Sequence, residues 1–258
     1  TGVLLSGGLF DGAFENAGDI EGGSTGVAMT LETVTGPFTN SGSIDGLGND
    51  GVAILVTNWG SAEARADVVN TSTGVINGAD TGFLLDVGTM HGDFVNDGVI
   101  HGGGSDTGLH VIAGTFNGDI TNNDLIDAPS NAMHLEIGTL NGEVVNTGTI
   151  AATESGSVAI AMAIGNGTTF TNTGGGVILG DVVFGGEAAY AFVAEDGRIE
   201  GDLIGEGDDD TITVQNGTHA FLSGAASNFQ SFTVANGGLA LMGAHFEGDG
   251  AGTGYGFA

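Results

Sequence analysis

The chain has 258 residues, of which 52 are glycine and only 2 are proline, with a mean hydropathy of +0.22. Glycine at this level destabilises helix interiors, so the composition argues against a helical protein. Asp and Glu number 32 against 2 Lys and Arg, for a formal net charge of −30, and there is no cysteine. These counts exclude nucleic-acid binding, attraction to anionic membranes, disulfides and thiolate metal sites. The apolar runs are far shorter than the roughly 18 residues of a spanning helix, so we expect no direct membrane insertion.

A short motif recurs along the chain, consisting of an apolar residue, any residue and Asn, followed by Gly and then Ile or Val. One copy reads Phe94-Val95-Asn96, with Gly98 and Ile100. The asparagines of its seven copies, spaced 24, 30, 26, 26, 24 and 26 residues apart, are Asn16, Asn40, Asn70, Asn96, Asn122, Asn146 and Asn172. A repeat of this period indicates structural units that stack on one another.

The residues between the motifs alternate between apolar and other residues, as in 83–87, 109–113 and 133–137. Alternation with a period of two predicts strands. We therefore predict an all-β parallel β-helix, or β-solenoid, with three short strands per coil of about 24–30 residues. The asparagine column has two structural interpretations: a ladder of amides bonded to the copies above and below, or a series of turn-forming residues.

The repeat pattern divides the chain into residues 1–206, which form regular coils, and residues 207–258, which form divergent coils and a Gly-rich tail. Thr1 precedes Asn16 by the same 15 residues as Thr81 precedes Asn96. This match predicts that the chain starts inside a coil, with Val3 and Leu5 at an open stacking end. Open strand edges are normally covered, so the expected partners are further coils of the same protein or identical subunits stacked end to end.

An acidic residue stands three positions before the repeat asparagine in four consecutive coils: Asp67, Asp93, Asp119 and Glu143. Like charges stacked about 4.8 Å apart repel unless they are screened or bridged. Calcium, which prefers oxygen ligands, is the candidate metal for these four residues, and a solvated ladder without any ion is the alternative. The run Asp208-Asp209-Asp210 is similar to a single copy of a calcium-binding nonapeptide repeat, but it is not repeated.

Alignment of Gly88, Gly114 and Gly138 places His110 and His134 side by side on adjacent coils, facing outward. Two histidines could contribute to a transition-metal site, but a closed site needs three or four ligands. We therefore expect an exposed stacked pair rather than a metal site.

The repeated Val-Asn-Thr-Gly-Thr-Ile type at 145–150 and the segment at 207–214 resemble the passenger regions of bacterial autotransporters and related surface adhesins. The resemblance covers nearly the whole chain and concerns fold rather than activity. It implies a right-handed β-helix exported to the bacterial cell surface, usually joined to a C-terminal outer-membrane barrel, of which this chain shows no pattern.

The function expected from these observations is that of a non-catalytic extracellular β-solenoid, a structural or adhesive segment of a bacterial cell-surface protein that could bind a host or surface glycan or protein. The main alternative is a filament subunit assembled head to tail through open coil ends. A more distant alternative is a carbohydrate-active β-helix enzyme. Pectin-degrading β-helix enzymes, which this fold resembles, carry a Gly-His-Gly loop and an Arg-x-Lys motif. This chain has no Gly-His-Gly, and its Arg198 is followed by Ile199 and Glu200.

Overall fold

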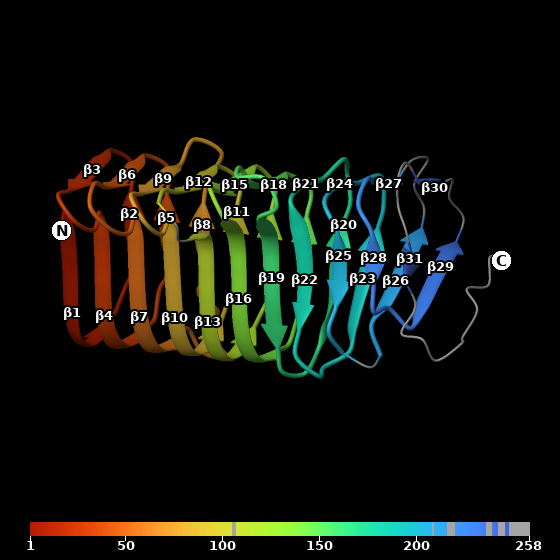
Figure 1. Ribbon diagram of the computed structural model, residues 1–258. Helices are drawn as coiled ribbons and strands as arrows, with labels where there is room; N and C mark the ends of the chain where they lie inside the picture. Colours follow the sequence, from red (N-terminus) through yellow and green to blue (C-terminus); the bar gives the residue numbers. More distant parts are fainter. Residues whose placement is uncertain (105–106, 208, 216–219, 236–238, 242–245, 248–258) are drawn as a thin grey trace.

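The structure is a computed structural model that describes residues 1–104, 107–207, 209–215, 220–235, 239–241 and 246–247. The described residues form three parallel sheets whose strands alternate along the chain, so that each circuit adds one strand to every sheet (Figure 1). This is the predicted all-β parallel β-helix with three strands per coil. No helix in the described part of the chain is long and apolar enough to cross a bilayer.

The strands of each sheet follow one another in chain order. Sheet A contains β1 (Val3–Phe10), β4 (Val27–Val34), β7 (Val52–Trp59), β10 (Phe83–His91), β13 (Thr107–Asn117), β16 (Asn131–Leu140), β19 (Val158–Ile164), β22 (Asp181–Gly185), β25 (Leu203–Gly205), β28 (Ala226–Ser227) and β31 (Phe246–Glu247). Sheet B contains β2 (Phe14–Asn16), β5 (Phe38–Asn40), β8 (Val68–Asn70), β11 (Phe94–Asn96), β14 (Ile120–Asn122), β17 (Val144–Asn146), β20 (Thr168–Asn172), β23 (Tyr190–Ala194), β26 (Thr211–Gln215) and β29 (Ser231–Ala235). Sheet C contains β3 (Asp19–Gly22), β6 (Ser43–Gly46), β9 (Val75–Gly78), β12 (Val99–Gly102), β15 (Leu125–Ala128), β18 (Thr149–Ala152), β21 (Val177–Leu179), β24 (Arg198–Glu200), β27 (Ala220–Leu222) and β30 (Leu239–Leu241).

The core is a set of apolar columns that run along the axis of the solenoid. In sheet B the first residue of the motif is paired coil to coil, as Phe94 is with Val68 and Ile120, and all three are buried. The isoleucines of sheet C form a second buried column, from Ile44 to Ile178. A continuous column of this kind supplies the burial that one coil could not achieve alone. The apolar residues of the repeat motif therefore point into the core.

Sheet A departs from the expectation of short strands, because β13 extends over 11 residues. A column of glycines lies in these strands or directly after them. A Cβ at each would lie 2.6–2.7 Å from a backbone oxygen of the preceding coil, and these residues are Gly88, Gly114, Gly138 and Gly165. Only glycine permits such a close approach of neighbouring backbones.

Coil length departs most from the 24–26-residue repeat in two places. The 30-residue coil includes an excursion over 60–66, closed where the buried Trp59 indole N–H donates to the Ala66 carbonyl at 3.0 Å. After Phe170 the coils become shorter, since Phe170 pairs with Phe192, Phe192 with Ile212 and Ile212 with Phe232. All three sheets continue across residue 206, so the divergent coils are hydrogen-bonded to the regular ones without a break.

Candidate functional site

The repeat asparagines form one buried column at the end of the sheet B strands. Each amide nitrogen donates to the amide oxygen of the next copy at 2.8–2.9 Å, from Asn16 through to Asn172. Asn96 Nδ2 also donates to the Leu125 carbonyl at 3.1 Å. None of the seven has a positive φ. The column is therefore a hydrogen-bonded amide ladder that holds adjacent coils in register.

The acidic column lies just before the sheet B strands, and its members are stacked through the backbone. Asp67 Oδ1 accepts the backbone N–H of Asp93 at 2.9 Å, Asp93 Oδ1 accepts that of Asp119 at 3.0 Å, and Asp119 Oδ1 accepts that of Glu143 at 2.9 Å. Arg65 adds an ion pair to Asp93 Oδ1 at 2.7 Å. These bonds offset part of the like-charge repulsion without an ion. Calcium bridging through the remaining oxygens stays a prediction.

Asp210, the last residue of the acidic run, is fully buried and faces the protein interior. Its carboxylate accepts the backbone N–H groups of Tyr190 at 3.0 Å and Gly207 at 3.1 Å. Burial raises the pKa of Asp210, opposed by the hydrogen bonds from these N–H groups. Asp209 is exposed, and Asp208 lies outside the described residues. Asp210 is thus bonded to the backbone of its own and the preceding coil.

The outer face of sheet A carries the one three-donor cluster of metal-ligand type in the described part of the chain. His110 on β13 and His134 on β16 are directly paired, with parallel rings whose centroids are 4.7 Å apart. Glu136 Oε1 lies 3.2 Å from His110 Nε2 and 3.5 Å from His134 Nε2. The stacked pair predicted from the sequence is present, and Glu136 is a third member that the sequence interpretation missed.

Electrostatics favour the neutral form of one of the two imidazoles. Burial lowers the pKa of His134, the neighbouring His110 lowers it further, and the Glu136 carboxylate acts in the opposite direction. Neutral imidazole is the form that binds metal ions.

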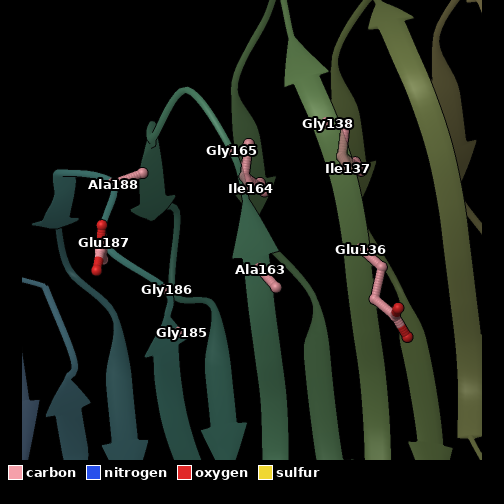
Figure 2. A pocket seen from close by; sticks show the side chains of 10 residues that line it. All are labelled: Glu136, Ile137, Gly138, Ala163, Ile164, Gly165, Gly185, Gly186, Glu187 and Ala188. Atoms are coloured by element: carbon pink, nitrogen blue, oxygen red, sulfur yellow. The ribbon is translucent and has the colours of Figure 1, made fainter.

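A shallow groove of about 510 Å³ lies beside this cluster on the same face. It is lined by Glu136, Ile137, Gly138, Ala163, Ile164, Gly165, Gly185, Gly186, Glu187 and Ala188 (Figure 2). In Figure 2 Glu136 and Glu187 lie on opposite sides of the groove, with Ala163 between them. The groove exists because glycine and alanine occupy outward positions that carry larger side chains elsewhere on the sheet, such as Leu55 and Ile112.

The first coil differs from the second in the burial of its inward side chains. Val3 and Leu5 pack only partly against the core, whereas their partners Val27 and Met29 are completely buried. β1 is hydrogen-bonded to β4 and to no other described strand. The structure thus places the predicted stacking end, Val3 and Leu5, at an open edge of the core.

Comparison with protein-family models, with curated proteins and with solved structures finds no match to this chain.

Proposed function

We propose that the chain is a non-catalytic, extracellular structural segment of a bacterial cell-surface protein of the autotransporter passenger type. The observation that carries this proposal is the continuity of the solenoid. In the described part of the chain the three sheets continue from coil to coil without a break between separate folding units, and an amide ladder joins the coils from Asn16 to Asn172. Such a design gives a stiff spacer whose length grows with the number of coils.

The surface chemistry supports an extracellular setting. A formal net charge of −30 keeps the molecule soluble, and external salt and divalent ions screen its self-repulsion. The absence of cysteine removes any dependence on redox conditions outside the cell.

The groove on sheet A favours a structural role over glycan cleavage. Its titratable side chains are Glu136 and Glu187, and Glu136 is engaged with two histidines. A glycosidase needs two carboxylates that face each other across the scissile bond. Glu136 is held by His110 and His134, so it is not a free carboxylate that could pair with Glu187 in this way.

Surface exposure of the native protein tests this proposal. Intact cells of the source bacterium are treated with a protease that does not enter the cell, and the chain is detected with an antibody against residues 1–206. We expect loss of the epitope from intact cells while a cytoplasmic marker persists. Survival of the epitope until the cells are lysed would overturn the extracellular assignment.

The second candidate function is that of a filament subunit, favoured by the open edge of β1. Val3 and Leu5 lie at the edge of the core, where another coil in parallel register would continue the apolar columns. Leu4, on the same strand, is 64% exposed and faces outward, so it provides a matched control. We expect the chain with Leu4→Lys to self-associate as the unmodified chain does, and the Val3→Lys/Leu5→Lys variant to be monomeric with folded central coils.

Light scattering of the purified chain and of both variants distinguishes these outcomes. A monomeric unmodified chain at all concentrations, or equal association of all three proteins, would overturn the filament candidate. It would leave coils of the same polypeptide as the remaining partner for β1.

A further inference from the structure

Strand pairing brings two imidazoles and one carboxylate to a single point on the outer face of sheet A. His110 pairs with His134, and Ile112 pairs with Glu136, so Glu136 lies diagonal to His110 and two residues beyond His134 on the same face. Diagonal neighbours in a sheet are within reach of long side chains. The register of β13 and β16 therefore fixes all three donors on adjacent coils.

The spacing of the donor atoms fits a small divalent ion. Zinc binds His nitrogen at about 2.0–2.1 Å and carboxylate oxygen at about 2.0–2.2 Å, so two ligands at a tetrahedral angle lie roughly 3.3–3.4 Å apart. Glu136 Oε1 lies 3.2 Å from His110 Nε2 and 3.5 Å from His134 Nε2. All three ligand atoms lie within 4.8 Å of one another. The two imidazoles, whose ring centroids are 4.7 Å apart, then have to turn their nitrogens toward a common point.

The cluster is also accessible and free of competing cations. The side chain of His110 is 22% exposed, that of His134 31% and that of Glu136 48%, so water or a fourth ligand can approach from solvent. The two arginines of the chain pair with Asp93 and Glu200, away from Glu136. Beside Glu136, the next coils carry Ala163 and Gly185 in register, which leaves room above the carboxylate.

We propose that His110, His134 and Glu136 bind one divalent late first-row transition-metal ion, such as Zn²⁺, Ni²⁺ or Cu²⁺, with water completing the coordination. Two imidazoles and one carboxylate form a known three-ligand set for such ions, whereas calcium and magnesium prefer oxygen ligands alone. The rings, now parallel, rotate about χ2 so that both Nε2 lone pairs point to the ion. The bound ion would link β13 to β16 on the outer face of sheet A. This proposal does not depend on the proposed function.

Isothermal titration of the full chain with ZnCl₂ tests the site, in a large excess of calcium that saturates the acidic surface. We expect one tightly bound Zn²⁺ per chain, and at least about tenfold weaker binding in His110→Ala, His134→Ala and Glu136→Gln, because even ligand-supporting residues contribute about 10–100-fold to affinity. His101→Ala is the matched control, since His101 Nδ1 pairs with Asp127 at 3.0 Å on sheet C and the described residues bring no third donor to that pair. It should bind Zn²⁺ as the unmodified chain does.

Electron paramagnetic resonance of the Cu²⁺-loaded chain gives a second readout that needs no variant. We expect superhyperfine coupling to two imidazole nitrogens. Unchanged Zn²⁺ affinity in the three ligand variants, an equal loss in His101→Ala, or a Cu²⁺ spectrum with oxygen ligands only would each overturn the proposal. Circular dichroism of the variants shows whether any loss of binding comes from unfolding.

Discussion

Removal of one amide from the asparagine ladder should destabilise the solenoid far more than removal of an amide from its surface. Asn96 is completely buried and makes three side-chain hydrogen bonds: it donates to Asn122 Oδ1 at 2.8 Å and to the Leu125 carbonyl at 3.1 Å, and it accepts from Asn70 Nδ2 at 2.9 Å. At about 1 kcal/mol net per bond, Asn96→Ala loses about 3 kcal/mol.

A further loss comes from the partner that stays buried. Asn122 Oδ1 loses its donor in a site without solvent access, and an unsatisfied buried acceptor costs about 1–3 kcal/mol. Asn70 Nδ2 keeps the carbonyls of Gly74 and Val99 as acceptors. We therefore expect Asn96→Ala to reduce the free energy of unfolding of the central coils by about 4–6 kcal/mol.

Asn77→Ala is the matched control, because Asn77 is only partly buried and makes one side-chain bond to Asp45, on the outer face of sheet C. Asn77→Ala should reduce the free energy of unfolding by about 1 kcal/mol or less. Hydrogen exchange resolved by coil is the appropriate assay, since solenoids unfold in segments rather than as one unit. Similar losses of protection around residues 94–96 in both variants would refute the view that the ladder holds the coils together.

Three further predictions concern the core, ion binding and pH. Phe94→Ala, which also removes an edge-to-face contact with Phe83, should lower the local free energy of unfolding by about 3–5 kcal/mol. Val95→Thr should lower it by less than about 1 kcal/mol. Equal losses in urea unfolding would contradict the assignment of Phe94 to the inside and Val95 to the outside. Calcium should raise the unfolding temperature more than sodium at matched ionic strength, and Asp119→Asn should reduce this difference; equal effects of the two salts would leave screening alone. Because the pKa of Asp210 is raised, the folded state binds the proton of this carboxyl more tightly than the unfolded state does. The protonated carboxyl therefore contributes to stability below the unfolded pKa of 3.8, and this contribution is lost as pH rises through the folded pKa. The unmodified chain should lose stability relative to Asp210→Asn across that interval in pH-dependent thermal unfolding, and a constant difference would contradict the shift.

The repeat was sufficient to predict the fold because a stacked coil imposes the same environment on every copy. A column such as Phe38, Phe94 and Phe170 is visible in the sequence, since equivalent positions meet equivalent neighbours in the core. The same logic correctly predicts that His110 lies beside His134. The stacking of Val3 and Leu5 on a further coil, which the shared 15-residue spacing suggested, stays a prediction.

Two kinds of contact were not predicted: side-chain hydrogen bonds to backbone N–H groups, and contacts between diagonal neighbours in a sheet. Glu136 stands two residues after His134, and the period of two would have placed it on the same face, so a signal was available. The bonds from backbone N–H groups to Asp67 and Asp93 have no such signal, because side-chain rotamers decide them. The groove depends on the smaller outward residues of β19 and β22, which alternation alone does not distinguish from ordinary surface.

We propose that β1 stacks on another parallel coil in the native assembly, and the direction of its amide groups makes this testable. Amide groups alternate in direction along a strand, and the Val3 N–H donates to the Gly26 carbonyl at 2.9 Å, so the N–H groups of Leu4 and Ser6 face away from β4. Hydrogen exchange of intact native material measures whether these two amides are paired. If β1 is stacked on another coil, Leu4 and Ser6 are protected to the same degree as Ala28 and Thr30, their partners on β4. Exchange of Leu4 and Ser6 at the rate of unpaired amides in that material would contradict it.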